Sequence, residues 1–491
     1  MEKMFINGKW LHSVNRETRD ITNPANGEVI TNVADGSEED VKLAINAARS
    51  AFDKGEWTET SARSRADLLY KVADKLTNRV EEFAKLETLN NGKPYREAEY
   101  DIQDAINQLQ YFAGLATKPK GQTFDVPEDM QSMVVREPVG VVGQIIPWNY
   151  PLVMAVQKIA PAIAAGCTIV IKPAEHTPLT LIKLFEIFDE SGFPPGVVNL
   201  VLGPGATVGA ELVRNPKVDK VAFTGGTETG IRIMKSAAET IKKVGLELGG
   251  KSPNIVFADA DFETAVDHAL YAIFSNQGQV CSAGSRLLLE KSIYDKFVPE
   301  LVRRAQKIKV GPGLMEGTEM GPLISENHMN RVLNYIDIGK NEGATLLCGG
   351  YKLEDEELSR GYFIAPTIFT DTTPEMRIVQ EEIFGPVLVI QTFETEEEAI
   401  TLANGTKYGL AGAVFTADGS KALRVIRKLR AGITWINTYH NTYNEAPWSG
   451  YKQSGIGREL GTYGFEEYLE TKQINISIRP KPSHWFGNET S

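Results

Sequence analysis

The sequence predicts an α/β protein with two α/β domains in series. From about residue 130 to residue 437, short apolar stretches alternate with helix-like stretches, a spacing typical of βαβ units around a parallel sheet. The chain has 491 residues, which is past the size at which a single hydrophobic core stops growing, so two or three domains are expected. Its content of 42% hydrophobic residues lets each domain form a core of its own.

Residues 37–117 precede the alternating region and are expected to be helical, because apolar and charged residues recur there every three or four positions. The Lys-Pro-Lys-Gly sequence at 118–121 then breaks the helical pattern. Strands are expected next at 133–136, 139–146, 167–171, 197–202 and 220–223. A second alternating block begins at Pro253, so the junction between the two domains is expected near residues 248–253.

Composition and charge argue against several classes of protein. Three well-separated cysteines without a Cys-x-x-Cys pair make neither a disulfide framework nor a zinc site, so we expect no metal and a reducing compartment. The N-terminus is charged where a signal peptide would be apolar, and no run of about 18 apolar residues follows, so we expect a cytoplasmic protein without membrane contact. The net charge of -12 argues against a nucleic-acid partner.

Cys281 is the candidate nucleophile. It lies within residues 274–286, where small polar neighbours offer an ordinary core thiol little to pack against. Thiolate is the reactive form and a free cysteine has a pKa of about 8.5, so a proton acceptor is needed. Glu247 is the candidate base, because Leu246 and Leu248 beside it predict partial burial and therefore a raised pKa. A histidine is the rival partner, which leaves a cysteine hydrolase as the alternative, although the six histidines lie in no recognisable signature.

Two glycine-rich turns indicate where an anion could bind. Residues 221–235 read as a buried strand, a glycine turn and an amphipathic helix whose free N–H groups suit a dinucleotide pyrophosphate; a plain strand-to-helix turn is the other interpretation. Residues 201–210 are a second such turn. Residues 245–252 match the Walker A pattern, but Pro253 follows and a strand is predicted there, so a P-loop nucleotide-binding protein is a weak alternative.

Seven segments of the chain together resemble one family. They are Pro-Trp-Asn-Tyr-Pro at 147–151, Lys-Pro-Ala-Glu at 172–175, residues 223–230, 246–251 and 278–281, Glu-Glu-Ile-Phe-Gly-Pro at 381–386, and residues 447–455. They resemble the NAD(P)-dependent aldehyde dehydrogenase superfamily, nearest its betaine-aldehyde and general aldehyde dehydrogenase branch. The segments follow the order of the family over nearly the whole chain, so the resemblance implies an enzyme that oxidises an aldehyde to the carboxylic acid with NAD.

The resemblance implies a covalent mechanism. Cys281 would attack the aldehyde carbon to give a thiohemiacetal, whose oxyanion the Asn149 amide and the Cys281 N–H would stabilise. After hydride transfer to the nicotinamide, Glu247 would deprotonate the water that hydrolyses the thioester. Lys158 and Glu459 match positions proposed to relay that proton, and ordinary structural charges are the alternative. A catalytically inactive relative is disfavoured, because Cys281, Glu247 and Asn149 are all present.

The resemblance also implies how the cofactor is held. Lys172 and Glu175 match residues that hydrogen-bond the adenosine ribose, and Glu382 and Phe384 match those that hold the nicotinamide ribose and ring. A carboxylate near the ribose 2′ position accepts a hydroxyl but repels a phosphate, so Glu175 predicts NAD over NADP. At the pyrophosphate, Gly226 stands where many members have Ser. The expected cofactor-binding residues are Ile146, Pro147, Trp148, Lys172, Glu175, Gly205, Phe223, Thr224, Gly225, Gly226, Thr229, Leu248, Glu382 and Phe384.

Four residues are expected to line the substrate tunnel: Tyr150, Gln157, Ser275 and Trp448. Tyr150 and Trp448 match aromatic residues with which betaine-aldehyde members contact a trimethylammonium group. Gln157 and Ser275 instead replace a tryptophan and a bulky residue, which would leave a roomier tunnel. Betaine aldehyde and larger aliphatic or aromatic aldehydes are therefore both candidate substrates.

The resemblance finally implies three structural parts. A Rossmann-like NAD-binding domain would comprise residues 1–118 and 139–248, and an α/β catalytic domain would comprise residues 249–450. A small bridging β element for oligomerisation would comprise residues 119–138 and 451–491. Because such elements pair strands across subunits, a homodimer or homotetramer is expected.

Overall fold

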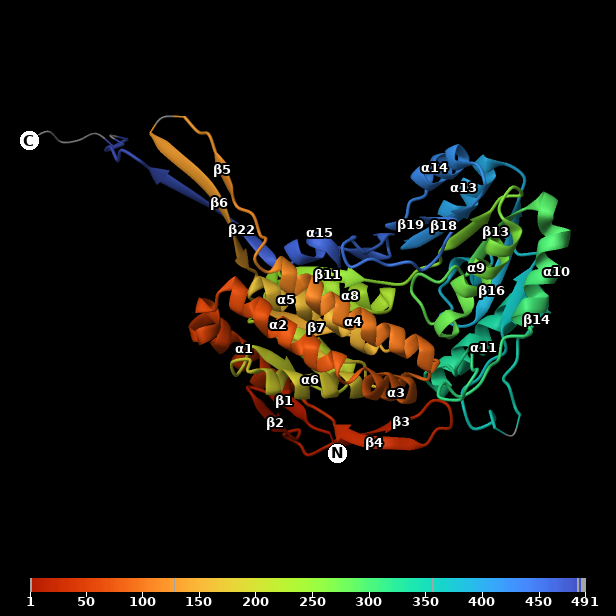
Figure 1. Cartoon of the computed structure of the whole chain (residues 1–491), viewed down its shortest axis with the longest axis horizontal. Coiled ribbons are helices and arrows are strands. Elements are labelled where there is room, and N and C mark those ends of the chain that lie inside the picture. The colour runs from red at the N-terminus through yellow and green to blue at the C-terminus, as the bar shows by residue number, and fades with distance from the viewer. Residues whose placement is uncertain (1, 128, 356, 484, 487–491) are drawn as a thin grey trace, which may run out of the picture.

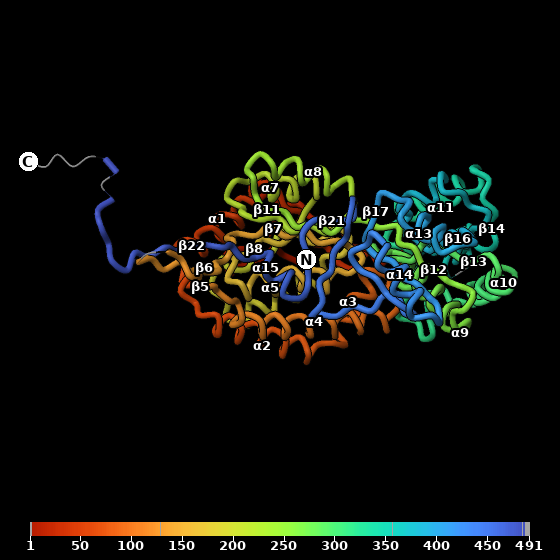
Figure 2. Tube along the Cα trace, turned by 90° about the horizontal axis from the view of Figure 1, so that it is seen from above, coloured from red at the N-terminus to blue at the C-terminus, as the bar shows by residue number. Residues whose placement is uncertain are grey.

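The chain folds into two α/β bodies and a β arm that extends from the first body (Figure 1). The computed structural model describes residues 2–127, 129–355, 357–483 and 485–486. Residues 484 and 487–491 of the expected bridging element lie outside these ranges, as do residues 1, 128 and 356. Figure 2 shows the first body in the middle, with the second body on one side and the arm on the other. The predicted α/β class is confirmed.

The first body is built on a mixed eight-stranded sheet with the order β2-β1-β9-β8-β7-β10-β11-β21. The five central strands from β9 to β11 are parallel, whereas β1, β2 and β21 run antiparallel at the edges. The strands are β1 (Met4–Ile6), β2 (Lys9–Leu11), β7 (Val141–Ile145), β8 (Thr168–Lys172), β9 (Val198–Leu200), β10 (Lys220–Thr224), β11 (Lys243–Glu247) and β21 (Gly455–Ile456). A separate pair, β3 (Thr18–Thr22) and β4 (Val29–Ala34), lies beside this sheet.

Helices cover both faces of this sheet. The predicted helical region 37–117 is confirmed as four α-helices, of which α2 and α4 pack against α5 (Figure 1). Helix α5 is buried along nearly its whole length, so its polar residues Gln157 and Lys158 lie in the interior. The helical segments of this body are α1 (Glu38–Lys54), η1 (Glu56–Glu59), α2 (Ala62–Thr77), α3 (Val80–Asn91), α4 (Tyr95–Leu115), α5 (Pro151–Ala165), α6 (Leu179–Ser191), η2 (Gly205–Gly209), α7 (Ala210–Arg214), α8 (Thr227–Ala237), η3 (Ala238–Thr240) and α15 (Gly461–Glu466).

The second body is built on a seven-stranded sheet with the order β14-β15-β16-β13-β12-β18-β19. Only β14 is antiparallel to its neighbour among these strands. The strands are β12 (Pro253–Val256), β13 (Arg286–Glu290), β14 (Thr345–Cys348), β15 (Thr367–Thr370), β16 (Val387–Phe393), β18 (Ala411–Phe415) and β19 (Ile433–Ile436), and the short pair β17 (Tyr408–Gly409) and β20 (Tyr451–Lys452) lies apart from them. The helical segments are α9 (Phe262–Phe274), η4 (Ser275–Gly278), η5 (Lys291–Ile293), α10 (Tyr294–Ala305), α11 (Glu326–Asn341), α12 (Arg377–Gln380), α13 (Glu396–Asn404) and α14 (Gly419–Lys428).

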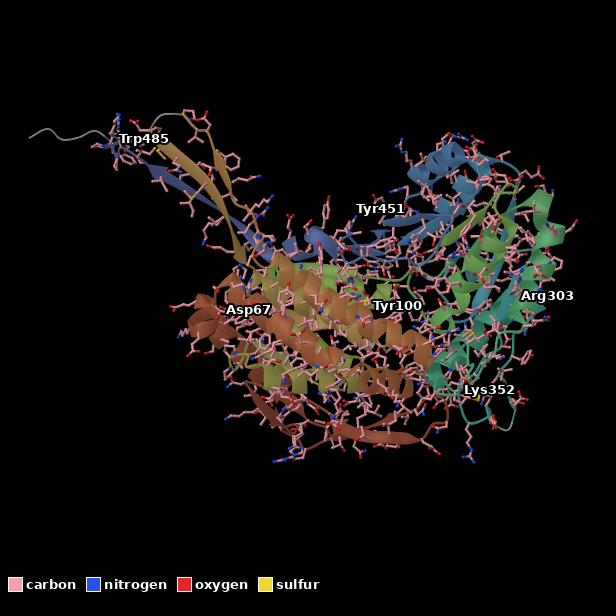
Figure 3. All side chains as sticks on the ribbon, viewed as in Figure 1. Asp67, Tyr100, Arg303, Lys352, Tyr451 and Trp485 are labelled. Atoms are coloured by element: carbon pink, nitrogen blue, oxygen red, sulfur yellow. The ribbon has the colours of Figure 1, made fainter. Side chains whose placement is uncertain are left out.

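The arm is a three-stranded antiparallel sheet of β5 (Gln122–Phe124), β6 (Met130–Pro138) and β22 (Leu469–Ser477), with β6 in the middle. It joins segments far apart in the sequence, since Pro138 pairs with Leu469 and Met130 pairs with Ser477. Trp485 lies at the far end of the arm and is 83% exposed (Figure 3). The arm therefore offers strand edges and apolar side chains away from both hydrophobic cores.

The secondary structure on either side of residue 250 shows whether residues 245–252 form a phosphate-binding loop. Strand β11 ends at Glu247 and β12 begins at Pro253, so the intervening loop leads into a strand, as predicted. A phosphate-binding P-loop must open into a helix, and the P-loop alternative is therefore wrong. In the described part of the chain, no helix is long and apolar enough to cross a membrane.

Candidate active site

The central strands of the first body set up the site. Counted along the chain, the five parallel strands have the spatial order 3-2-1-4-5, which reverses between β7 and β10. In open α/β sheets, ligands bind at the carboxyl ends of strands beside such a reversal. Ile146 and Pro147 follow the end of β7, and Gly225 and Gly226 follow the end of β10. The expected cofactor residues thus gather where this fold binds nucleotides.

Cys281 lies in the loop between helix α9 and strand β13. After α9, Asn276, Gln277 and Gly278 all have positive φ angles of 44°, 58° and 70°. This left-handed run turns the chain sharply, so that Cys281 lies half-buried in the wall of a cavity. Ordinary residues avoid such a conformation, and its presence beside the thiol is typical of a functional loop.

The cavity has a volume of about 890 Å³ and lies between the two bodies. Tyr100 on α4 lines it from the first body and Arg303 on α10 from the second (Figure 3). All four residues expected in the substrate tunnel line it together with Cys281: Tyr150, Gln157, Ser275 and Trp448. The structure therefore brings together side chains from segments that are widely separated in the sequence.

The surroundings of Cys281 hold its thiol protonated. Burial raises the pKa of Cys281 to about 12, and the nearby carboxylates Glu382 and Glu247 act in the same direction. The sequence left open whether Glu247 could lower the pKa of Cys281. In the ligand-free chain, the negative charge of Glu247 raises it. The surroundings of Cys281 in the ligand-free chain therefore favour the protonated thiol.

Glu247 ends strand β11 and is 5% exposed. Burial, and then the negative charge of Glu459, raise the pKa of Glu247 well above its ordinary value, as Leu246 and Leu248 had led us to expect. Its Oε2 atom has no hydrogen-bond partner within ordinary distance among the described residues, although the nearby Ser449 hydroxyl acts to lower the pKa of the carboxyl group. A buried carboxyl group with a raised pKa can accept a proton near neutral pH, as the sequence led us to expect of Glu247.

Lys158 and Glu459 form a buried ion pair beside Glu247. Lys158 is completely buried on α5, and its Nζ also donates to Thr224 Oγ1 at 2.6 Å. Gln157 Nε2 donates to the other carboxylate oxygen of Glu459. The peptide of Glu459 pairs with that of Trp448, so this cluster lies against the cavity. The three sequence candidates Lys158, Glu459 and Gln157 thus form one connected network.

Asn149 lies in the turn between β7 and α5 and is 5% exposed. Its side-chain Nδ2 donates to the carbonyl oxygen of Gln279 at 2.9 Å, two residues before Cys281. One N–H of the amide is therefore used to orient the side chain, and the second N–H remains for another acceptor.

Glu175 and Lys172 lie at the end of strand β8. Lys172 is 3% exposed, and burial lowers its pKa to about 8. Partial burial opposes ionisation of Glu175, but the N–H of Gly205 together with Lys172 and Arg19 lowers its pKa. Gly205 donates to Glu175 Oε1 at 2.7 Å, and Arg19 pairs with Oε2 at 2.9 Å. Arg19 was not identified from the sequence, because nothing in strand β3 marks it.

The glycine turn after β10 leads into helix α8, as predicted. A side chain at Gly226 would meet open space, so the serine common in the family would fit there. Gly230, one turn into the helix, packs closely on Leu248. Phe223 and Thr224 are buried at the strand end, whereas Thr229 is exposed on the first helical turn. The helix start therefore offers backbone N–H groups and space for a phosphate group.

Glu382 and Phe384 approach the same region from the second body. The N–H of Gly250 donates to Glu382 Oε1 at 2.9 Å, and burial raises the pKa of Glu382 to about 7. Phe384 has a φ of 65°, and its ring packs edge-on against Trp148 at 5.2 Å. His328 holds this segment through Phe384 O at 2.7 Å.

Sequence reasoning missed the acidic wall of the cavity. Glu97, Asp101 and Asp104 on α4 all line it, and burial raises the pKa of Glu97 to about 7. The spacing of these three acids in the sequence could have indicated this wall, because intervals of four and three along a helix place them on one face. It was not recognised because acidic residues on a helix usually face solvent.

Among the described residues that line the cavity, His440 is the histidine that the cysteine hydrolase alternative would need. His440 lines the cavity, but Nε2 contacts Ala272 O at 3.1 Å and Nδ1 contacts Ser282 Oγ at 3.4 Å. Burial lowers its pKa to about 4, so the ring is a weak proton acceptor. In the described ranges, no group of three or more His, Cys, Asp or Glu side chains could hold a metal ion.

Comparison with known proteins agrees with this geometry. Residues 10–474 match the aldehyde dehydrogenase family. The chain is 53% identical over 488 residues to a betaine aldehyde dehydrogenase of Bacillus subtilis strain 168, covering 99% of this chain and 100% of that protein. It is 47% identical over 484 residues to a mitochondrial aldehyde dehydrogenase of Rattus norvegicus, covering 98% and 92%. A crystal structure of betaine aldehyde dehydrogenase from Staphylococcus aureus in complex with NAD+ superposes with a TM-score of 0.98, at 52% identity, over 99% of this chain and 97% of that chain.

The chain therefore belongs to the aldehyde dehydrogenase family, as the seven sequence segments predicted. It is an enzyme of the class that oxidises aldehydes.

Proposed function

We propose that the chain oxidises an aldehyde to the carboxylic acid with NAD as the hydride acceptor. The observation that carries this proposal is that Cys281 lines the cavity, with the Asn149 amide hydrogen-bonded two residues before it and the buried carboxyl of Glu247 near enough to raise the pKa of the thiol. A thiol nucleophile, an amide donor and a separate base are the groups that a thiohemiacetal, its oxyanion and a thioester hydrolysis require.

The residues that follow the carboxyl ends of the central strands fit NAD. Glu175, 40% exposed and held by Gly205 N–H, offers a fixed carboxylate for the adenosine ribose hydroxyls, and Lys172 lies beside it. The open space at Gly226 suits the pyrophosphate, and Glu382 with Phe384 would hold the nicotinamide ribose and ring. When bound, NAD supplies the acceptor for the hydride. Because Glu175 would repel a 2′-phosphate, we propose NAD over NADP.

Cys281 would attack the aldehyde carbon as the thiolate, after its proton leaves. The free N–H of Asn149 and the Cys281 N–H would stabilise the oxyanion that forms on the aldehyde oxygen, a contribution of about 2.7–4 kcal/mol for one such donor. Loss of hydride from the thiohemiacetal carbon leaves a thioester on Cys281. The protein's part in this stage is to hold the substrate oxygen against fixed donors.

Glu247 would act in the second stage. Its raised pKa makes it a strong base once its proton has left, and its free Oε2 can accept a proton from the water that attacks the thioester. The ion pair of Lys158 and Glu459 lies next to Glu247 and would pass the proton toward solvent. Hydrolysis releases the carboxylic acid and returns the Cys281 thiol.

The cavity suits an aldehyde with a cationic group, such as betaine aldehyde. Trp448 and Tyr150 supply aromatic faces, which are the part of the lining that suits a cationic group. The acidic side chains of α4 add less, because burial favours their protonated forms and Lys93 pairs with Asp101. The ammonium of Lys93 already lies 4.2 Å from the Tyr150 ring centroid, which leaves Trp448 as the main aromatic contact. Gln157 and Ser275 keep the cavity wide, so larger uncharged aldehydes are the second candidate class.

We also propose the cellular and quaternary setting that the sequence led us to expect. The three cysteines are unpaired, which suits the cytoplasm. The arm presents strand edges to a second subunit, which suits a homodimer or homotetramer. The proposed parts are the NAD-binding domain (1–118 and 139–248), the catalytic domain (249–450) and the bridging element (119–138 and 451–491). Light scattering tests the assembly, and a monomeric mass would contradict it.

Steady-state rates on a panel of aldehydes test the substrate. We expect kcat/KM for betaine aldehyde to exceed that for hexanal, benzaldehyde and retinal, and Trp448→Ala to reduce the betaine aldehyde value most. A Trp448→Ala variant that loses activity equally on all four aldehydes would contradict a cation-binding role. Comparable kcat/KM for NAD and NADP would contradict the proposed role of Glu175.

A further inference from the structure

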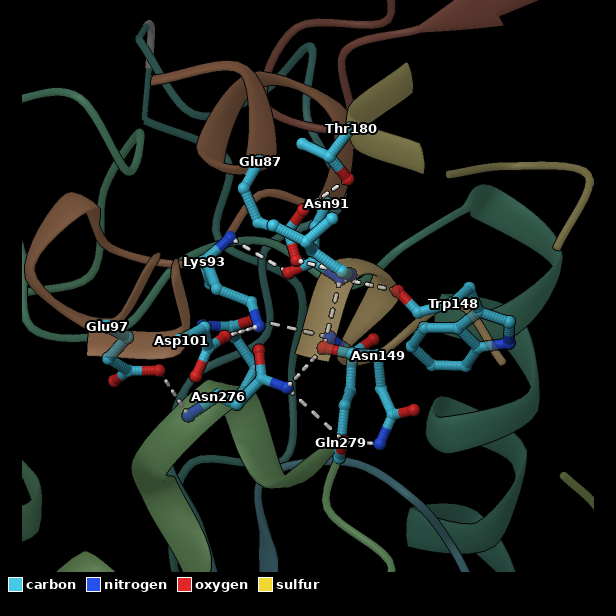
Figure 4. A network of polar contacts seen from close by, with 12 residues as sticks. Glu87, Asn91, Lys93, Glu97, Asp101, Trp148, Asn149, Thr180, Asn276 and Gln279 are labelled. Carbon is cyan, nitrogen blue, oxygen red and sulfur yellow. Dashed lines mark hydrogen bonds and ion pairs between the residues drawn. The ribbon is translucent and has the colours of Figure 1, made fainter. Parts of the chain in front are cut away.

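Two backbone carbonyl oxygens beside Cys281 accept hydrogen bonds from one buried side chain. Asn276 Nδ2 donates to Asn149 O at 3.1 Å and to Gln279 O at 3.4 Å (Figure 4). Gln279 O also accepts the bond from the side chain of Asn149. Asn276 therefore ties the cysteine loop of the second body to the turn of the first body that carries Asn149.

The chemistry of the contacts fixes which way Asn276 points. Both partners are carbonyl oxygens, so only the amino end of the Asn276 amide can face them. Its Oδ1 atom is buried and has no hydrogen-bond partner among the described residues. A buried acceptor without a partner lowers stability, so the two bonds that the Asn276 amino group donates are made at a cost to the fold.

The backbone of Asn276 is held as firmly as its side chain. Its N–H donates to Glu97 Oε2 at 3.0 Å, from helix α4 (Figure 4). On the other side of the turn, Asn91 Nδ2 donates to Trp148 O at 2.8 Å and to Asn149 O at 3.5 Å. The peptide of Asn149 is thus clamped from α3 and from the cysteine loop at once.

We infer that Asn276 is a positioning residue for oxyanion stabilisation, acting through Asn149. By holding the carbonyl oxygens of Asn149 and Gln279, it fixes the direction of the Asn149 amide, whose second N–H then meets the developing oxyanion. The inference rests on the proposed aldehyde oxidation through Cys281. Asn276 itself touches neither the reacting carbon nor the cofactor in this account.

A purely conformational role is the competing explanation, because Asn tolerates the left-handed backbone that residue 276 adopts. Asn276→Gly separates the two roles, since glycine keeps this backbone conformation and removes only the side-chain bonds. We expect kcat to fall by about tenfold to a hundredfold, with little change in the KM for aldehyde, because the donor is displaced rather than lost. Gln277→Gly is the matched control at the next left-handed position, where the buried side chain accepts a hydrogen bond from Gln279 Nε2 and, among the described residues, makes none to the carbonyl oxygens of Asn149 or Gln279.

A double-mutant cycle with Asn149→Ala gives the decisive readout. If Asn276 acts through Asn149, Asn276→Gly has no further effect on kcat in the Asn149→Ala background. Equal losses in both backgrounds, an unchanged kcat in the single variant, or an equal loss from Gln277→Gly would overturn the inference. If Asn276→Gly does not fold, Asn276→Asp replaces it in the same cycle, because Asp retains the shape and the backbone tolerance but not the amide donor. Activity of the wild-type chain and inactivity of Cys281→Ser test the proposed function separately.

Discussion

The side-chain amide of Asn149 donates a 2.9 Å hydrogen bond to the carbonyl oxygen of Gln279, two residues before Cys281. This bond joins the two α/β bodies next to Val280 and Cys281, which line the cavity. It leaves the amide with one N–H to offer and fixes its direction before substrate arrives, which is the property that makes an oxyanion donor effective.

Replacing Asn149 by Ala removes this donor. We expect kcat to fall by about 100- to 1000-fold, because the oxyanion loses a fixed hydrogen bond. The KM for NAD should change little, since the proposed role of Asn149 is to hold the aldehyde oxygen and not the cofactor. Steady-state kinetics with NAD and aldehyde measure both values, and a kcat within about threefold of wild type would exclude the oxyanion role.

Glu247→Gln keeps the shape of the side chain but removes the base. We expect one equivalent of NADH per active site in a rapid burst, followed by a steady rate at least about 100-fold slower, because the thioester is formed but not hydrolysed. In the wild type, the hydrolysis rate should rise with pH as Glu247 loses its proton, with a midpoint above the ordinary range for Glu. Stopped-flow absorbance resolves the burst, and a Glu247→Gln variant without a burst, or with a wild-type steady rate, would contradict the assignment.

Lys158→Met should destabilise the protein strongly. It would leave the buried carboxylate of Glu459 without its cation, a loss that typically costs about 3–5 kcal/mol. The double variant Lys158→Met with Glu459→Gln should recover part of this loss, since no buried charge is left uncompensated. Lys183→Met is the control, because its ion pair with Glu186 is about one-third exposed and should contribute no more than about 1 kcal/mol. Denaturant unfolding compares the four proteins, and equal losses for Lys158 and Lys183 would contradict a structural ion pair.

The sequence predicted those parts of the site that follow strand ends or recur as local motifs. The helical region before residue 118, the strand after Ser252 and the glycine turn after β10 all depend on short-range patterns, and the structure confirms them. Burial of Glu247 was also predictable, because apolar neighbours on a strand end indicate that the side chain between them is withdrawn from water.

The remaining features depend on tertiary contacts that no local pattern carries. Asn276 and Glu97 are 179 positions apart, and their hydrogen bond exists only because helix α4 of the first body lies against the cysteine loop of the second. The left-handed run at residues 276–278 and the pairing of Arg19 with Glu175 have the same origin. The direction of the pKa shift of Cys281 likewise depends on Glu382, which approaches from a distant part of the chain.

The high pKa of Cys281 predicts slow alkylation of the ligand-free enzyme. The rate with iodoacetamide should rise about tenfold per pH unit between pH 7 and pH 10 without a plateau, because thiolate is the reactive form and its fraction keeps growing below the pKa. Glu382→Gln should speed the reaction by about threefold, since it removes a negative charge that raises this pKa. Mass spectrometry after timed quenching follows the modification, with Cys348→Ser as the control. A plateau below pH 8 would contradict a protonated resting thiol.

The central claim is that Cys281 carries the aldehyde through oxidation by NAD. Its most direct test is the rate of NAD reduction with aldehyde by the wild-type chain, by Cys281→Ser and by the control Cys348→Ser. The account predicts activity for the wild type and for Cys348→Ser, and a loss of at least about 1000-fold for Cys281→Ser, because the nucleophile itself is replaced. Equal activity of Cys281→Ser and wild type would contradict it.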